Sequence, residues 1–125
     1  MLLNFTNHPY EIWNTAQRDA AHRQYGRVED LPFPQVDPAL EPEGIRLLVE
    51  EYADRIEARK PDAVLAEGEF TLLFMLVDRL LRDGVNVVCT CSGRETVETK
   101  KPDGTNEKKA VFSFERFRTY EYYKQ

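Results

Sequence analysis

The stretch from Ala63 to Gly84 limits the possible folds of this chain more than any other. It begins with four apolar residues, Ala63 to Ala66, and continues through a glycine-containing turn into an apolar run from Leu72 to Leu81. A short apolar run before a turn is typical of a buried strand, whereas the longer run that ends at Gly84 is typical of a helix. We therefore predict a strand–turn–helix unit whose turn lies at the carboxyl end of a parallel strand.

Shorter patterns on both sides of this unit predict the remaining elements. Apolar and β-branched runs predict strands, and a period near 3.6 predicts helices. The expected strands are Leu2–Phe5, Val28–Leu31, Val85–Thr90, Glu95–Lys100 and Lys108–Phe114. The expected helices run from an N-cap at Asn14 to about Tyr25, and over Ile45–Ile56, with a stiff proline-rich loop from Pro32 to Pro42 between them.

This alternation predicts one α/β domain that spans residues 1–125. Strands that alternate with helices require a mostly parallel sheet with helices on both faces. We expect a Rossmann-like sheet with a flavodoxin-like start, strand order 2-1-3-4, followed by a C-terminal β-hairpin around Asp103-Gly104. The topological switch point, where such sheets bind ligands, then lies between the first and third strands.

Three polar segments are expected to meet at the carboxyl end of the sheet. They follow the first, third and fourth strands, and the third precedes a helix N-terminus, which attracts anionic groups. The candidate ligand-binding residues there are Thr6, Asn7, Gly68, Glu69, Phe70, Ser92 and Gly93.

Four further side chains have the chemistry of a nucleotide site, and each also has a structural alternative. His8 suits hydrogen bonding or acid–base work, or it stabilises its own loop. Thr71, with Glu69, contacts ribose or phosphate, or caps the following helix. Arg94 and Arg116 suit phosphate, or are ordinary edge-strand charge. Arg116 belongs to a last strand in which Phe112, Phe114, Arg116 and Arg118 occupy alternate positions.

Composition excludes several classes of protein. The net charge of −5 argues against a duplex nucleic-acid surface, and no apolar run is long enough to span a membrane. The two cysteines, in a chain with no visible secretory signal, indicate reduced thiols and a cytoplasmic location. Two histidines and two cysteines are too few for a recognisable metal site, and no dinucleotide or Walker motif is present, so we expect no metal and no cofactor.

Four segments together resemble the small stand-alone CARF-like accessory proteins of type III CRISPR systems. The segments are Leu3–Pro9, Gly68–Thr71, Cys89–Arg94 and Val111–Tyr120. The resemblance implies a homodimer that binds a cyclic oligoadenylate second messenger across its two-fold axis, and several such proteins are similar to ring nucleases, which cleave the messenger without metal. It makes His8, Thr71 and Arg94 the candidate catalytic residues, although Cys91-Ser92-Gly93 stands where Thr-Thr or Ser-Glu is expected.

The leading hypothesis is therefore recognition, and possible cleavage, of a cyclic oligoadenylate by attack of its own ribose 2′-hydroxyl. Two alternatives remain open at this point. One is a protein that sequesters the messenger without cleaving it. The other is an enzyme of nucleoside metabolism, such as an N-glycosidic transferase that uses Glu69 as its nucleophile.

Overall fold

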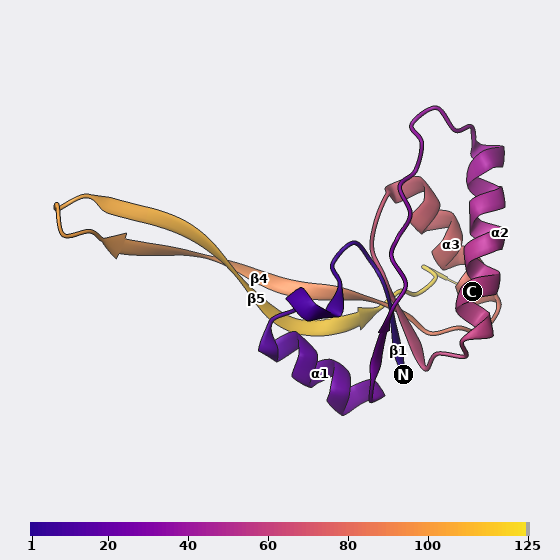
Figure 1. The fold of residues 1–125 in the computed structure, drawn as a ribbon, viewed down its shortest axis with the longest axis horizontal. Coiled ribbons are helices and arrows are strands. Elements are labelled where there is room, and N and C mark those ends of the chain that lie inside the picture. The colour runs from indigo at the N-terminus through magenta and orange to yellow at the C-terminus, as the bar shows by residue number, and fades with distance from the viewer. Residues whose placement is uncertain (125) are drawn as a thin grey trace.

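The computed structural model describes residues 1–124 as an α/β domain with a long β-hairpin (Figure 1). A short 3₁₀ turn, η1 (Tyr10–Ile12), precedes the first helix. The helices are α1 (Thr15–Tyr25), α2 (Pro42–Ala58) and α3 (Phe70–Arg82). The strands are β1 (Leu2–Phe5), β2 (Val28–Asp30), β3 (Ala63–Ala66), β4 (Val87–Lys100) and β5 (Asn106–Thr119).

The five strands form one mixed sheet in the order β2-β1-β3-β4-β5. The pairs β1/β2, β1/β3 and β3/β4 are parallel, and β4/β5 is antiparallel. The predicted α/β class is confirmed, and the first four strands stand in the expected order. The predicted C-terminal hairpin differs in detail: β4 itself forms its first arm, and β5 joins the edge of the same sheet antiparallel to β4.

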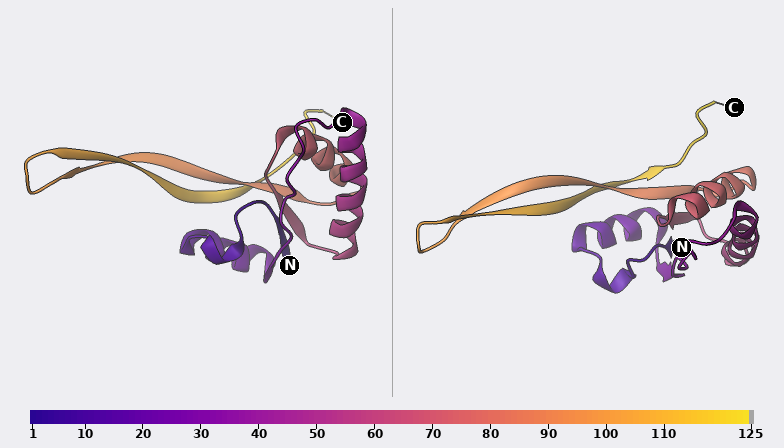
Figure 2. Two further views of the ribbon diagram at one scale, coloured as in Figure 1. Left: turned by 45° about the horizontal axis from the view of Figure 1, so that its top comes forward. Right: turned by 90° about the horizontal axis from the view of Figure 1, so that it is seen from above.

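Alternate strand residues build a core on each face of the sheet. Leu3 and Phe5 of β1 pack with the apolar faces of α2 and α3. Leu2, on the opposite face, packs with Trp13 and the α1 residues Ala20 and Ala21. Helices therefore cover both faces, as predicted, with α1 beneath the start of the β4–β5 hairpin (Figure 2).

The ends of the helices follow local chemistry. Asn14 caps α1 by accepting a hydrogen bond from the Gln17 amide, and Gly26, at φ +83°, ends it. Pro42, which we expected in the preceding loop, is instead the first residue of α2, where its missing N–H is harmless. No helix within residues 1–124 is long and apolar enough to span a membrane.

The fourth strand is more than twice as long as predicted. The polar segment Ser92-Gly93-Arg94, expected as a loop at the sheet end, lies inside β4, and its residues pair with Phe114, Ser113 and Phe112. Side-chain polarity suggested a break there, but the ladder uses backbone groups, which β5 supplies at every step. This correction moves Arg94 away from the carboxyl end of β3.

A bulge in β5 changes which side chains share a face. Cys91 pairs with Arg116 and Ser92 with Phe114, so Glu115 is the extra residue. Phe114 and Phe117 therefore lie on one face, with ring centroids 5.0 Å apart. The strict alternation that we predicted for β5 is wrong, because the bulge turns Arg116 and Arg118 to the opposite face.

Beyond the bulge the hairpin leaves the domain. We call residues 93–113 the arm, and every side chain from 94 to 113 in it is exposed. Figure 1 shows the arm projecting well past α1 as a twisted two-stranded ribbon. Its loop contains the predicted Asp103-Gly104 turn, in which Asp103 accepts hydrogen bonds from the Thr105 amide and hydroxyl.

Candidate functional site

A buried asparagine orders the loop after β1. Asn4 is 1% exposed, and its Nδ2 donates to the His8 carbonyl and to Asp30 Oδ1, both at 2.8 Å. The Thr6 hydroxyl donates to Asn4 Oδ1 at 2.8 Å, and Trp13 Nε1 donates to the same His8 carbonyl at 2.9 Å. Asn4 and Trp13, which donate to the His8 carbonyl, are both buried, so they hold the His8 backbone at the switch point. The His8 side chain itself is exposed.

A small cavity of about 190 Å³ opens on the α1 side of this loop. The predicted residues Thr6 and His8 line it, and so do Glu67, from the loop after β3, and Thr90 of β4. Three neighbouring strands, or the loops that follow them, thus contribute polar side chains to one cavity. The remaining lining residues are Ile12, Trp13, Asn14, Gln17 and Leu65.

Glu67 and Thr90 connect β3 to β4 inside this cavity. Glu67 Oε2 accepts hydrogen bonds from the Thr90 amide at 2.9 Å and from the Thr90 hydroxyl at 2.8 Å. Among residues 1–124, Glu67 Oε1 takes part in no side-chain hydrogen bond. One carboxylate oxygen is therefore structural, while the other can accept a hydrogen bond from a ligand hydroxyl or amino group.

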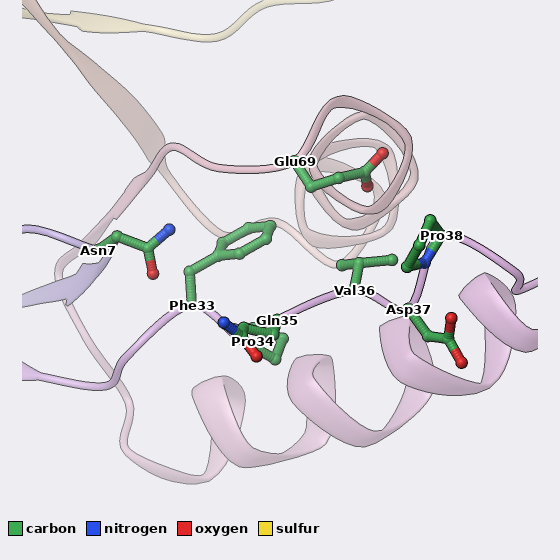
Figure 3. Close-up of a pocket in the computed structure, with 8 residues that line it drawn as sticks. All are labelled: Asn7, Phe33, Pro34, Gln35, Val36, Asp37, Pro38 and Glu69. Atoms are coloured by element: carbon green, nitrogen blue, oxygen red, sulfur yellow. The ribbon is translucent and has the colours of Figure 1, made fainter.

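A larger cavity of about 700 Å³ lies on the other side of the switch point. It is lined by Asn7, by Glu69 and by the proline-rich segment from Phe33 to Pro38. Figure 3 shows the Phe33 ring between Asn7 and Glu69 in that view. The loop residue Gly68 allows this approach, because a Cβ there would lie 2.6 Å from the Phe33 ring.

Glu69 and Thr71 cap α3. Glu69 accepts from the amides of Thr71 and Leu72, at 3.1 and 2.8 Å, and from the Thr71 hydroxyl at 2.7 and 2.8 Å. The Leu72 amide, followed by Thr71, lowers the pKa of the Glu69 carboxyl. The structural alternative for this pair is therefore observed, and a carboxylate with both oxygens engaged is poorly placed to be a glycosidic nucleophile.

The β4 residues Ser92 and Arg94 continue the row that begins at Thr90. Strand residues two apart share a face, so all three lie on the α1 side of the ribbon. Four residues at about 3.3 Å each place Arg94 about 13 Å beyond Thr90. The Arg94 guanidinium lies 5.9 Å from the centroid of the Phe112 ring, which is 66% exposed.

The other predicted residues are dispersed. Gly93 on β4 and Arg116 on β5 both lie on the face of the hairpin opposite to this row. Phe70, at the start of α3, is 85% exposed and lines an apolar groove instead of either polar cavity. The structure thus brings together Thr6, His8 and Thr90, with Ser92 and Arg94 farther along the same face of β4. It separates all of them from Phe70, Thr71 and Arg116.

Three residues of the site, Asn4, Glu67 and Thr90, are not among the predicted site residues. Asn4 lies inside an otherwise apolar strand, and a polar residue there is itself a signal of a buried network. Glu67 directly follows β3, which should have marked it as a rim residue. Thr90 was assigned to the strand without a role, because its contact with Glu67 depends on the β3–β4 pairing.

Metal ligands do not gather in the described chain. Within residues 1–124 no three His, Cys, Asp or Glu side chains lie close enough to hold a metal ion. Cys89 and Cys91 are both free thiols and half-buried. Burial, followed by the charge of Cys91, raises the pKa of the Cys89 thiol, so this side chain is a poor ligand or nucleophile at neutral pH.

Comparison with known families gives a match that covers almost the whole chain. The model of the family described as "Uncharacterized protein MJ1673 family" matches residues 1–118. The matched residues include every helix, the arm, and β5 up to its penultimate residue. A search of curated proteins finds no match.

Proposed function

We propose that this chain, which belongs to the MJ1673 family, binds a cyclic oligoadenylate along the α1-side face of the sheet and cleaves it without metal. The observation that carries the proposal is a row of side chains on this face. His8, Glu67 and Thr90 line one cavity, and Ser92 and Arg94 follow along β4, where Arg94 pairs with Phe112. We call these six residues the polar strip.

The chemistry of the polar strip matches the parts of an oligonucleotide. A free carboxylate oxygen on Glu67 suits ribose hydroxyl or adenine amino groups, and the Arg94 guanidinium suits phosphate. The exposed Phe112 ring offers a surface on which a base can stack. Because about 13 Å separates Thr90 from Arg94, a ligand that contacts both is extended, as several linked nucleotides are.

In the proposed reaction the ribose 2′-hydroxyl attacks the adjacent phosphorus and the bond from phosphorus to the 5′-oxygen breaks. The 2′-hydroxyl proton passes to a base, and the departing 5′-oxygen gains a proton, so the products are a 2′,3′-cyclic phosphate and a 5′-hydroxyl. His8 and Glu67 line one cavity and are the candidates for these proton transfers. The protein supplies alignment and charge stabilisation.

A homodimer is part of this proposal. A cyclic ligand has several equivalent nucleotides, and a two-fold pair of subunits offers each polar group twice. The cavity of about 190 Å³ on one subunit is small for a whole cyclic oligonucleotide. A second subunit supplies a second copy of these polar groups to the same ligand.

The experiment is incubation of the protein with cyclic tri-, tetra- and hexa-adenylate, followed by chromatography of the products. Cleavage gives linear products with a 2′,3′-cyclic end, and it continues in EDTA because no metal takes part. Recovery of intact ligand bound to the protein indicates sequestration without cleavage. Absence of binding to all three ligands overturns the proposal.

Two arginines on opposite faces of the hairpin provide a matched test. Arg94→Ala should weaken binding about ten- to hundredfold, because a charge-assisted hydrogen bond contributes about 1.5–3 kcal/mol. Arg94→Lys should restore part of this, since a point charge lacks the bidentate fork. Arg116→Ala removes the same charge from the other face and should bind like the parent. Equal effects of the two alanine variants would refute the assignment of the polar strip.

A further inference from the structure

An apolar groove with exposed aromatic rings lies between α3 and the C-terminal tail, residues 120–124. The groove has a volume of about 500 Å³, and its walls include Leu73, Val77, Leu81 and Tyr122. Tyr122 fixes the tail against α3 by donating a hydrogen bond from Oη to the Asp78 carbonyl at 3.2 Å. The groove is therefore part of the folded domain.

Three aromatic side chains project beside this groove. Phe70 is 85% exposed, Phe74 is 80% exposed and Tyr123 is 95% exposed. Since a large aromatic side chain carries roughly 200 Å² of surface, these three present roughly 500 Å² per chain. This is the size of the largest apolar patch on a typical monomer, and such patches are often functional. We call these three rings and the groove the α3 face.

The α3 face has the properties of a self-complementary surface. Projecting rings and a groove that can receive a ring lie side by side, so a two-fold partner can place its rings in this groove while accepting rings in return. Its charges are Asp78, Glu121, Arg82 and Lys124, two of each sign, and the last two line the adjoining hollow. The chain as a whole carries −5, so this balanced face opposes self-association less than the average surface does.

We propose that the α3 face is the interface of a homodimer, with Phe74 of each copy seated in the groove of the other. The rings of two copies together present about 1,000 Å², somewhat below the 1,200–2,000 Å² that a stable interface buries, before the walls of the groove are counted. Phe70 directly follows Glu69, which lines the larger polar cavity, so pairing brings the two copies of that cavity near the two-fold axis. The pairing does not rest on the proposed function, because the polar strip lies on the opposite, α1 side of the sheet.

Sedimentation equilibrium of the full chain without ligand tests the interface. The parent protein should be a dimer at micromolar concentration. Phe74→Glu and Tyr123→Glu should each raise the dimer dissociation constant at least about thirtyfold, as loss of a central aromatic contact does. Leu47→Glu is the matched control, because Leu47 is 68% exposed on α2 and lies outside the groove. It should sediment as the parent does.

Every outcome bears on the interface. Because both aromatic residues are exposed, their variants should keep the circular-dichroism spectrum and melting temperature of the parent. If the parent protein is a monomer at tens of micromolar, the proposal is overturned. This holds even if the α3 face binds a different protein. A dimer that Phe74→Glu and Tyr123→Glu both leave intact also overturns it. Since no ligand is present, failure of cyclic oligoadenylate binding leaves this result unaffected.

Discussion

Replacing Asn4 by aspartate tests the network that holds His8. The side chain keeps its size, so no cavity forms, but Nδ2 is lost together with its hydrogen bonds to the His8 carbonyl and Asp30. Both acceptors keep other donors, because Trp13 Nε1 still reaches the carbonyl and the Tyr10 amide still reaches Asp30. The loss of two bonds therefore costs about 1–3 kcal/mol.

The larger effect of Asn4→Asp is electrostatic. The introduced carboxylate would stand beside Asp30 at the present hydrogen-bond distance of 2.8 Å. At about 4 Å such a repulsion reaches about 4 kcal/mol in a partly buried site. The repulsion is limited, because protonation of one of the two carboxyls removes it. For an ordinary pKa near 3.9, this protonation costs about 4 kcal/mol at pH 7 and about 1.5 kcal/mol at pH 5. The total loss at pH 7 is then about 5–7 kcal/mol.

The sign of the pH dependence follows from this limit. A second carboxylate nearby raises the pKa of the introduced carboxyl in the folded state, so the folded state binds the proton more readily than the unfolded state. Stability relative to the parent should therefore recover by about 2.5 kcal/mol as the pH falls from 7 to 5.

Urea unfolding followed by circular dichroism, at pH 7 and pH 5, measures both effects. The control is Asn7→Asp, the same substitution at an exposed loop position, which should change stability by less than about 0.5 kcal/mol. A loss below about 1 kcal/mol for Asn4→Asp at pH 7, or an equal loss at both pH values, would refute the network.

Three further predictions concern the same end of the sheet. Gly68→Ala should destabilise the protein by about 1–3 kcal/mol, because its Cβ would lie 2.6 Å from the Phe33 ring. Gly93→Ala is the control and should not destabilise it, because its Cβ meets nothing nearer than 4.0 Å. Chemical denaturation of both variants tests this. Glu69→Gln should lower the free energy of unfolding by about 1 kcal/mol at pH 7. The helix cap lowers the pKa of Glu69, so its stabilisation is lost on protonation and the difference between parent and variant should shrink below the ordinary pKa of 4.5. A difference that stays constant in denaturation at a series of pH values would contradict this. Burial raises the pKa of Tyr120 to about 12, so the folded state should lose stability between about pH 10 and 12 through this group. Tyr120→Phe should lose less stability in that range. An equal loss of melting temperature in parent and variant would be evidence against this role of Tyr120.

The sequence by itself determined the elements whose signal is local. The apolar run at Ala63–Ala66, the helix that follows it, and the α1 cap at Asn14 are each encoded within about a dozen residues. Their alternation also determined the α/β class and the neighbours β2-β1-β3-β4, because short right-handed crossovers leave few other arrangements. The loop of Thr6 and His8 was placed at the switch point for the same reason.

Only the tertiary structure decided how the candidate site residues are shared among surfaces. Ser92 and Arg94 look like a loop, but backbone pairing with β5 keeps them in a strand, which carries Arg94 onto the arm. The bulge at Glu115, which no local pattern marks, decides that Phe114 joins Phe117 while Arg116 faces away. The partnership of Glu67 with Thr90 depends on parallel pairing between strands more than twenty residues apart. Local chemistry sets the elements, whereas register between distant strands sets which side chains meet, because one residue of slip moves every side chain to the other face.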